Sequence, residues 1–580
     1  MKVELTLNQA LATLRAQPEG VSRSKIFLVC GFQPLHLATF LKAHYALRFP
    51  DRAADVLEGH YGDLDGTLTV AAKSDATAAA VVIEWGDLDS RLGLRSSGGW
   101  GLSAEADILA NCGQRWARIL TRLKELASRM PVALAPPTLP FPFLGHTAGW
   151  QMSAAEAELH KQAAGFLAEA ARIANVRILH PSRLAKVSPE ASRRDPNMEL
   201  AAGFPYSLRH ASALAEQLVQ LLYPPSPMKG LITDLDETLW SGIVGEVGVQ
   251  AVCWGVGEHA QIHGLYQQQL RHFSEMGVLL AIASKNDPAV AEEALRREDL
   301  LVPGTAFFPI EVGWGPKSQA VAEILQAWNI GPESVVFVDD SPMELAEVRA
   351  AFPAMTCLPF DKRNAAKAME LFEQLRDLFG KPAVHREDTL RQASIRASAS
   401  IREAAAQPDD GDFVRGLQGK LIFDIRKSGA NKRLLELINK TNQFNLNGVR
   451  IGEGEWLRHL EDECSFAVGV AYEDRFGPLG TIGVLAGRQC GGLVEVTSWV
   501  LSCRAFSRQI EHHMLEYLLG RPGATAIRLC FRPSERNRPL QEFLRSKGLD
   551  CGQPGILELT REHLRTTGPL PHEARTLEHD

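Results

Sequence analysis

The chain has few cysteines and no long apolar run. Its 580 residues include 9 cysteines, which are spread singly, with no CxxC pair and no Cys/His spacing of the kind that holds zinc. This excludes a disulfide-stapled scaffold and predicts free thiols in a reducing compartment. No apolar run reaches the ~18 residues that a membrane span needs, and the opening stretch MKVELTLNQA lacks a basic-then-apolar signal pattern. We therefore expect a cytoplasmic protein with no membrane partner.

An excess of charge of one sign is also lacking. The 69 acidic and 62 basic residues leave a net charge of -7, so we expect no nucleic-acid partner, although a local basic patch is compatible with this total. Hydrophobic residues make up 45% and charged residues 23%, which excludes a mostly disordered chain and a collagen-like or coiled-coil rod. At about 150 residues per domain, the length predicts three or four domains.

Residues 1–227 alternate short apolar runs with stretches rich in Ala and Leu. Continuous apolar runs predict buried strands, and apolar residues at helical spacing predict helices. The strands are Lys25–Cys30 and Ala79–Trp85, and the helices are Trp116–Leu126 and Ala154–Ala174. The four prolines of Ala133–Phe143 predict a loop. Strands that alternate with helices favour an α/β domain with a parallel sheet.

Residues 228–382 restart this alternation after a proline-rich break at Pro224–Pro227. Three apolar strands are predicted, at Gly230–Asp234, Val278–Ala283 and Ser334–Val338. Each ends in a small cluster of polar residues. Because ligands of open α/β sheets bind at the carboxyl ends of the strands, we expect these clusters to converge on one site.

Residues 383–415 are charged, rich in Ala and Ser and poor in large apolar residues, which predicts a surface helix or a linker between domains. Residues 416–580 predict a mixed α+β domain. Its strands are Phe466–Tyr472, Leu479–Ala486, Val494–Leu501 and Ala526–Phe531, with a helix at Ser507–Leu519. The chain is thus predicted to hold three domains and one linker.

Two carboxylates lie two residues apart at the end of the strand that opens the second block, in Thr233-Asp234-Leu235-Asp236-Glu237-Thr238. In extended backbone, Asp234 and Asp236 would point the same way. Such a pair suits a nucleophile with a general acid/base, or it holds a divalent cation. A solvated strand end is the third interpretation of this motif taken alone.

The next two predicted strands end in groups that suit phosphate and metal. Ser284 and Lys285 follow the second strand, and the Ser284 hydroxyl could bond a phosphate oxygen. Lys317 opens a predicted helix, where its ammonium suits an anion. Asp339 and Asp340 end the third strand and could complete a magnesium site.

This order of motifs resembles the haloacid-dehalogenase (HAD) phosphotransferase superfamily. The resemblance implies that Asp234 is a nucleophile that forms an aspartyl-phosphate, and that Asp236 is the general acid and base. It implies Mg²⁺ held by Asp234, the backbone carbonyl of Asp236 and Asp339, with Asp340 supporting the metal shell. Ser284, Lys285 and Lys317 are then expected to bind phosphate. Phosphoryl transfer depends mainly on positioning and charge neutralisation, which such a set supplies.

Longer stretches resemble the FkbH-like family within that superfamily. They are DLDETLWSGIVGE, LAIASKND, VGWGPKSQAVAEIL and VFVDDSPMELAEVR, and in the third block KTNQFNL (residues 440–446) and Ser502-Cys503-Arg504. The resemblance implies an SGNH-like N-terminal α/β domain, a HAD-like domain and a GNAT-like (acyltransferase-like) C-terminal domain. It also implies removal of phosphate from 1,3-bisphosphoglycerate, a phosphorylated three-carbon acid, and loading of a glyceryl unit as a thioester onto an acyl carrier protein.

Both outer domains depart from their families' patterns. An SGNH hydrolase has a serine nucleophile after its first strand, whereas this chain reads Cys30-Gly31-Phe32-Gln33; a structural or docking role is therefore favoured over hydrolysis. A GNAT domain has glycines that let backbone amides cradle a pyrophosphate. Here the stretch Arg504–Gln509 has none, which argues against free coenzyme A. Arg504 and Arg508 lie either near the phosphate of a carrier arm or on a plain surface.

Two cysteines are candidates for holding the acyl group, because a thioester preserves its activation. Cys253 follows the first HAD-like motif, and Cys503 lies beside the arginines; either could also be a small buried hydrophobe. In KTNQFNL, the polar Lys440, Asn442, Gln443 and Asn445 predict recognition of the carrier arm or of acyl hydroxyls. The other interpretation is a turn or a helix cap.

The sequence thus predicts a magnesium-dependent enzyme that dephosphorylates an acyl phosphate of phosphoglycerate type and loads the acyl unit onto a carrier protein. One alternative is a phosphatase without acyl transfer. The other is a carrier-protein docking scaffold, which the presence of the five residues Asp234, Asp236, Ser284, Lys317 and Asp339 disfavours.

Overall fold

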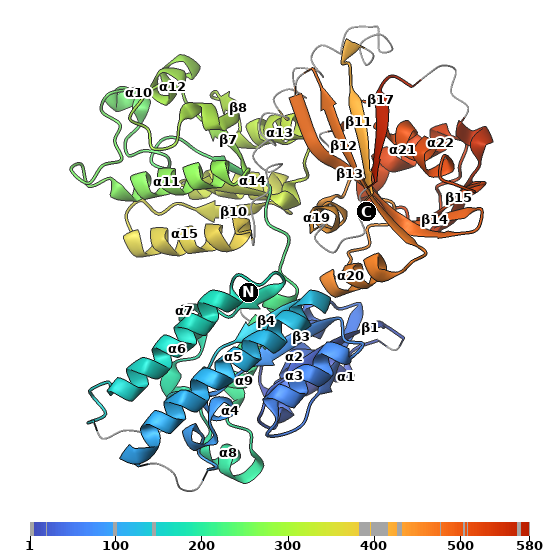
Figure 1. The fold of residues 1–580 in the computed structure, drawn as a ribbon. Coiled ribbons are helices and arrows are strands. Elements are labelled where there is room, and N and C mark those ends of the chain that lie inside the picture. Colours follow the sequence, from blue (N-terminus) through green and yellow to red (C-terminus); the bar gives the residue numbers. More distant parts are fainter. Residues whose placement is uncertain are drawn as a thin grey trace. The chain divides into compact units, whose positions relative to one another are not determined.

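The computed structural model describes residues 5–18, 20–96, 101–141, 147–381, 395, 416–425, 432–475, 477–502, 505–506, 508–564 and 570–578. The chain divides into two compact units. The first unit is Met1–Pro225 together with Ile451–Asp462, and the second unit is Ser226–Arg450 together with Glu463–Asp580. Figure 1 shows their elements. Among the described residues, no helix is long and apolar enough to cross a membrane.

The first unit contains a five-stranded parallel sheet in the order β2-β1-β3-β4-β5, which is the order of one common doubly wound fold. Its strands are β1 (Ser22–Val29), β2 (Arg52–Glu58), β3 (Ala78–Val82), β4 (Val132–Ala135) and β5 (Val176–Ile178). Its helices are α1 (Leu7–Arg15), α2 (Leu35–Arg48), α3 (Leu64–Lys73), α4 (Trp85–Leu88), α5 (Glu105–Arg129), α6 (Ala154–Ala170), α7 (Pro181–Val187), α8 (Pro196–Ala202), α9 (Leu208–Leu222) and α20 (Glu453–Glu461).

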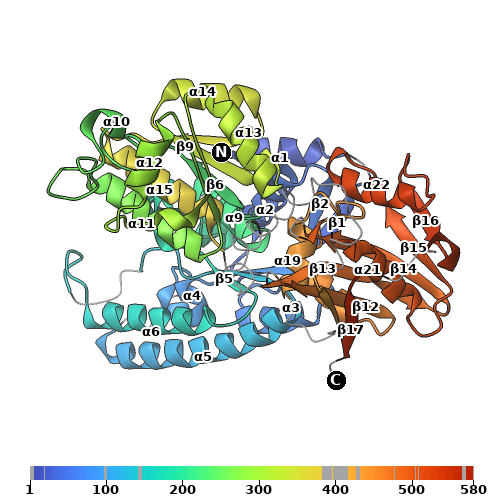
Figure 2. The ribbon, with the colours of Figure 1, turned by 90° about the horizontal axis from the view of Figure 1, so that it is seen from above.

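Alternate residues of these strands feed two separate cores. In β1, Ile26 and Leu28 pack with α1, α2 and α9, whereas Phe27 and Val29 pack with α3, α5 and α6. Because successive side chains of a strand point to opposite faces, a strand covered on both faces is apolar throughout. All five residues of β3 are buried for this reason. The paired helices α5 and α6 run side by side (Figure 2).

The second unit begins with another five-stranded parallel sheet, in the order β10-β9-β6-β7-β8. Its strands are β6 (Gly230–Thr233), β7 (Leu279–Ser284), β8 (Phe307–Val312), β9 (Val335–Asp339) and β10 (Thr356–Pro359). Its helices are α10 (Val244–Val247), α11 (Gln261–Glu275), α12 (Pro288–Leu295), α13 (Lys317–Trp328), α14 (Pro342–Ala351) and α15 (Ala365–Phe379). Helices α11 and α15 contribute to the core on one face, and α13 and α14 to the core on the other.

A seven-stranded mixed sheet completes the second unit, in the order β16-β15-β14-β13-β12-β11-β17. Its strands are β11 (Lys420–Ile425), β12 (Ser465–Asp474), β13 (Gly477–Cys490), β14 (Leu493–Leu501), β15 (Ala526–Phe531), β16 (Gly555–Leu559) and β17 (Glu573–Glu578). Its helices are α19 (Lys432–Lys440), α21 (Ile510–Leu519) and α22 (Arg538–Ser546). Strands β14 and β15 are parallel neighbours. On the other side of each, β13 pairs antiparallel with β14 and β16 pairs antiparallel with β15.

The multidomain α/β architecture with parallel sheets that the sequence predicts is confirmed. One local prediction is wrong: Ala133–Phe143 is not loop throughout, because Val132–Ala135 forms the buried interior strand β4 before the prolines begin. The helix expected at Trp116–Leu126 is longer and spans Glu105–Arg129. Almost all of the predicted linker, residues 383–415, lies outside the described residues.

Candidate active site

Asp234 and Asp339 meet where the strand order of the second unit's parallel sheet reverses. Strand β6 ends at Thr233, strand β9 ends at Asp339, and the two strands are parallel neighbours with Thr233 opposite Val338. The connections from β6 and from β9 lead away in opposite directions along the sheet, because β7 lies on one side and β10 on the other. Such a reversal opens a crevice at the carboxyl ends of the strands, where ligands of doubly wound sheets bind.

Lys317 joins these two carboxylates. Its side chain, only 4% exposed, places the ammonium nitrogen 2.9 Å from Oδ1 of Asp234 and 2.5 Å from Oδ2 of Asp339. Burial alone would lower the pKa of Lys317, but the attraction of the two carboxylates outweighs it and raises the pKa. The lysine therefore keeps its charge in a buried position.

Asp234, Asp339 and Asp340 form an acidic cluster that could hold a metal ion. One carboxylate oxygen of each lies within 4.8 Å of the others. Burial and the repulsion of Asp234 raise the pKa of Asp339 to about 7. Burial also raises the pKa of Asp340. The donor set suits Mg²⁺, which prefers carboxylate oxygens, and a cation would remove the repulsion between the acids.

The Asp236 side chain is held outside this acidic cluster. Its Oδ1 accepts hydrogen bonds from Trp240 Nε1 (2.8 Å) and the Val244 amide (3.1 Å). Its Oδ2 accepts one from Asn286 Nδ2 (2.9 Å). Three donors thus fix the orientation of this carboxylate, which is not one of the three that form the cluster. This suits an acid/base role more than metal ligation through the side chain.

Ser284 and Lys285, at the end of β7, have different partners. Ser284 is buried, and its Oγ accepts a weak 3.4 Å hydrogen bond from Asn286 Nδ2. Ser284 thereby belongs to the same polar group as Asp236. Lys285 points elsewhere, since its ammonium pairs with Oε1 of Glu344 at 2.8 Å. The structure therefore brings Ser284 to the site and gives Lys285 a carboxylate partner.

Two residues of the site were missed by sequence reasoning. Asn286 orients Asp236, and its place directly after Ser284 and Lys285 at a strand end was the available signal. Lys362 pairs with Oε2 of Glu237 at 2.9 Å and Oδ2 of Asp340 at 3.1 Å. Lys362 follows β10 and belongs to no motif, so nothing in the sequence pointed to it.

Cys253 lies in the long connection that follows β6. Its amide and carbonyl pair with those of Ser241, a few residues after Asp236. The side chain is partly exposed, and burial together with the charge of Glu258 raises the thiol pKa. Cys503 and Arg504 lie outside the described residues. Arg508 is 1% exposed and pairs with Asp474 at 3.1 Å, so it is not part of an open basic surface.

The segment Phe444–Asn447, here called the wedge, lies between β14 and β15. These strands pair only from Leu493 to Val496 and from Ala526 to Leu529, and then part. The Leu446 amide donates to Trp499 on β14, while the Leu446 carbonyl accepts from Arg532 beyond β15. The side-chain Nδ2 of Asn447 donates to a carbonyl of each strand, that of Thr497 (2.9 Å) and that of Cys530 (3.1 Å). The chain itself therefore fills the gap between the parting strands.

The side chain of Asn445, within the wedge, forms hydrogen bonds with backbone groups. Its Nδ2 donates to the carbonyls of Ile438 and Thr441, and its Oδ1 accepts from the backbone amides of Asn447 and Gly448. The side chain is 3% exposed. Of the two interpretations of KTNQFNL, the turn-forming one describes Asn445.

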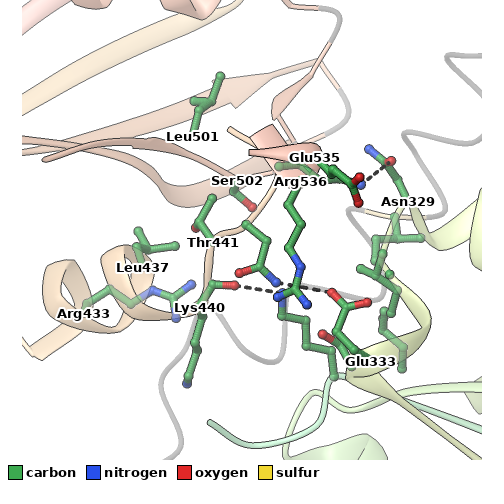
Figure 3. Close-up of a pocket in the computed structure, with 18 residues that line it drawn as sticks. Asn329, Glu333, Arg433, Leu437, Lys440, Thr441, Leu501, Ser502, Glu535 and Arg536 are labelled. Carbon is green, nitrogen blue, oxygen red and sulfur yellow. Dashed lines mark hydrogen bonds between the residues drawn. The ribbon is translucent and has the colours of Figure 1, made fainter. Parts of the chain in front are cut away.

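Lys440, Asn442 and Gln443 line a pocket of about 270 Å³ within the second unit, together with residues that precede β6 and β9 (Figure 3). Asn442 Nδ2 lies 3.4 Å from Oε1 of Glu333, and Gln443 Nε2 lies 3.4 Å from Oδ1 of Asn329. The pocket therefore adjoins the amino ends of the parallel strands. Asp234 and Asp339 follow the carboxyl ends, so the structure does not bring these amides to the acidic cluster.

Comparisons with known proteins give no sequence family. No family model matches the chain, and no curated protein matches it. Among solved structures, the N-terminal part of BF1531 from Bacteroides fragilis, described as containing a phosphatase domain complexed with Mg, is 17% identical. The match covers 65% of this chain and 100% of that one with a TM-score of 0.49.

Two further solved structures are more distant. An uncharacterised protein from Corynebacterium glutamicum is 17% identical over 27% of this chain and 98% of its own, with a TM-score of 0.19. A fungal multi-domain β-N-acetylglucosaminidase with a GCN5-related glucosamine N-acetyltransferase region is 10% identical, over 94% of this chain and 67% of its own, with a TM-score of 0.16.

Proposed function

We propose that the chain is a magnesium-dependent phosphatase of the HAD type that also loads an acyl unit onto a carrier protein. The observation that carries the phosphatase part is the position of Lys317, which contacts both Asp234 and Asp339 at the reversal point of a parallel sheet. Asp236 and Ser284 adjoin them in the polar group that Asn286 holds. A nucleophile, a separately oriented second carboxylate, a buried cation and a metal-binding acidic cluster are what phosphoryl transfer needs.

The residues divide the reaction into two steps. An Asp234 oxygen attacks phosphorus, the bond from phosphorus to the substrate oxygen breaks, and Asp236 gives its proton to that oxygen. Asp236 then takes a proton from water, which attacks phosphorus and releases inorganic phosphate and free Asp234. Lys317 and Ser284 bind the phosphoryl oxygens during both steps. Asp234, Asp339, Asp340 and the Asp236 backbone carbonyl would hold Mg²⁺, which would supply further positive charge to those oxygens.

The proposed substrate is 1,3-bisphosphoglycerate, and the proposed acceptor is the thiol of an acyl carrier protein. Attack of a thiol on the acyl carbon expels the acyl phosphate as inorganic phosphate and leaves a thioester. The Asp234 site hydrolyses the phosphate ester at the other end of the three-carbon unit. Both events release phosphate, and only the first transfers the acyl group, whose activation the thioester retains. The substrate, the acceptor and the glyceryl identity come from the resemblance to FkbH-like proteins.

A thiol of the chain is proposed to receive the acyl group first. Cys253 lies in the connection after β6, the same connection that begins with Asp234 and Asp236. Burial, and then the charges of Glu258 and Glu237, raise the pKa of its thiol, so it needs a base to become a thiolate. Cys503 is the second candidate, from its place in the sequence.

The test combines the full chain, Mg²⁺, 1,3-bisphosphoglycerate and a carrier protein with its pantetheine arm, and weighs the carrier by intact mass spectrometry. The expected result is a gain of one glyceryl unit. The matched control is the same carrier without its arm, which should gain nothing. If the armed carrier gains no mass, the transfer proposal is wrong.

One observation favours a phosphatase without acyl transfer as the second candidate. The wedge occupies the gap between β14 and β15 with its own hydrogen bonds, so the described part of the third block offers no open gap for an acyl carrier there. This candidate predicts phosphate release that is unchanged when the carrier protein is omitted. A docking scaffold would show neither release nor transfer.

A further inference from the structure

The first unit contains a large hollow that the reaction above does not use. It has a volume of about 860 Å³ and is lined by residues that follow β1 and β3, including Gly31, Glu84 and Asp87, and by one side of α5. Strands β1 and β3 are neighbours, and β2 lies on the far side of β1. The hollow therefore lies at the carboxyl ends of the strands at the point where the strand order reverses, which is where doubly wound sheets bind ligands. Its size suits a small organic molecule.

Most acidic groups around the hollow are already satisfied. The Glu84 carboxylate accepts hydrogen bonds from the Thr138 amide and hydroxyl, from the Leu139 amide and from the Tyr206 hydroxyl. Asp89 holds Arg91 through two hydrogen bonds of 2.8 and 2.6 Å. The hydrogen-bonding capacity of these two lining carboxylates is therefore met by donors of the protein itself.

A third acid of the wall is also paired. Glu199 forms an ion pair with Arg194 at 3.3 Å. Its pKa is raised by burial. Once these pairs are set aside, the charged groups that remain around the hollow are one carboxylate, Asp87, and three arginines, Arg95, Arg115 and Arg118.

The three arginines form salt bridges with none of the described carboxylates. Two of them belong to a polar stripe on α5 that faces the hollow, made of Asn111, Gln114, Arg115 and Arg118. These positions have the i, i+3, i+4, i+7 spacing of one helix face. Like charges at Arg115 and Arg118 repel each other on the helix. An anion bound between them would turn this cost into attraction, and guanidinium groups bind phosphate and carboxylate through paired hydrogen bonds.

Asp87 lines the hollow next to Gly31. Its Oδ2 accepts the Glu84 amide at 2.8 Å. Its Oδ1 lies over Gly31, so close that a side-chain carbon at that position would be 1.9 Å away. Glycine at position 31 therefore leaves room for this oxygen, and no hydrogen bond from the described residues reaches it. Burial raises the pKa of Asp87 to about 7, and Arg115 opposes the rise. Oδ1 is thus a free acceptor for a hydroxyl or amine of a ligand.

We propose that this hollow binds an organic phosphate ester. Its phosphate is received by Arg95, Arg115 and Arg118, and a hydroxyl group of its organic part donates to Oδ1 of Asp87. The excess of guanidinium groups that form no salt bridge with a described carboxylate selects an anion and not a metal ion. The ligand could be a free phosphorylated hydroxy acid or the phosphate ester of a pantetheine arm, which share this chemistry. The site lies in the first unit and is independent of the acidic cluster of the second.

The test is hydrogen–deuterium exchange of the full chain, with 3-phosphoglycerate, coenzyme A and inorganic phosphate as separate probes. At least one of the two esters should slow exchange in the peptides that cover residues 84–95 and 111–118. Protection by 3-phosphoglycerate would identify the ligand as a free phosphorylated hydroxy acid, and protection by coenzyme A would identify it as the phosphate ester of a pantetheine arm. In the double variant Arg115→Gln/Arg118→Gln, the dissociation constant should rise at least about a hundredfold, because two charge-assisted hydrogen bonds are lost.

The matched control is Arg122→Gln, which changes an exposed arginine of the same helix that pairs with Glu125; binding should be unchanged. Asp234→Asn should also leave protection of the two peptides intact, since it changes the other unit. Asp87→Asn should weaken the ester about tenfold and leave inorganic phosphate unaffected. The proposal is overturned if neither ester protects these peptides, or if the double variant binds as the native chain does.

Discussion

The ammonium nitrogen of Lys317 lies 2.5 Å from Oδ2 of Asp339, a carboxylate with no exposed surface. The same nitrogen lies 2.9 Å from Asp234. Two buried acids thus share one buried cation, which neutralises only half of their charge. The pKa of Asp339 is raised to about 7 by burial and by Asp234. The site is therefore built for additional positive charge, which a divalent cation would bring.

Replacement of Lys317 by Met should destabilise the chain in the absence of metal. Two carboxylates would remain buried without a cation, and the loss of one partner of a buried ion pair costs about 3–5 kcal/mol. Mg²⁺ should restore much of this loss. Thermal unfolding with and without Mg²⁺ measures both effects. Lys367→Met changes an exposed lysine of α15 and should do neither. A variant as stable as the native chain without metal would contradict the prediction.

Asp234→Asn should abolish phosphate release while the fold stays intact. An amide cannot serve as the nucleophile, and removal of a nucleophile lowers turnover by about a thousandfold or more. A phosphate assay beside circular dichroism tests this. Asp377→Asn, at an exposed position of α15, is the control and should keep full activity. Retained release in the Asp234 variant would show that another group is the nucleophile.

Asn447→Ala should loosen the parting ends of β14 and β15. The Asn447 side chain donates to a carbonyl of each strand, and loss of such donors costs about 1–3 kcal/mol. Faster hydrogen exchange is expected in residues 493–501 and 526–531, with a lower thermal midpoint. The exposed Asn197, on α8 of the first unit, provides the control variant Asn197→Ala. Unchanged exchange at both strands would mean that the wedge does not hold them.

Acidification should destabilise the first unit through His210. Burial lowers the pKa of His210 to about 3, well below the 6.5 of an exposed histidine. Thr138 Oγ1 donates to Glu84, so His210 Nε2–H donates to Thr138 and Nδ1 accepts from Ser188. The folded state therefore holds the neutral ring, whereas the unfolded chain binds a proton below pH 6.5.

The direction of this pH dependence follows from which state, folded or unfolded, binds more protons. Between pH 6.5 and about 3, the unfolded state binds more protons, so the free energy of unfolding falls as pH falls, by about 1.4 kcal/mol per pH unit from this residue. The advantage of the native chain over His210→Asn should shrink by that slope in denaturant titrations from pH 7 to pH 5. His180→Asn, at an exposed position, should leave the slope unchanged. If the free energies of unfolding of the native chain and of the His210 variant changed with pH in parallel, His210 would not be the group that takes up the proton.

Features carried by contiguous residues were predictable from the sequence. The apolar run before Asp234 predicted β6, because a strand covered on both faces is apolar throughout. The polar residues after each such run predicted that Asp234, Ser284 and Asp339 meet, since parallel strands present their carboxyl ends at one edge. The proline-rich stretch Ala133–Phe143 misled the prediction of β4, because the strand occupies only its first residues and the prolines follow.

Contacts between distant residues were decided only by the tertiary structure. Lys317 reaches Asp234, Lys362 reaches Asp340, and Asn447 joins two strands that are each far from it in the sequence. No local pattern specifies such partners, because the choice depends on which side chains burial brings together and on which charges must then be neutralised. The same holds for the hollow of the first unit. Arg115 and Arg118 were ordinary helix residues in the sequence, and folding placed them on the lining of the hollow that also includes Asp87, where neither forms a salt bridge with a described carboxylate.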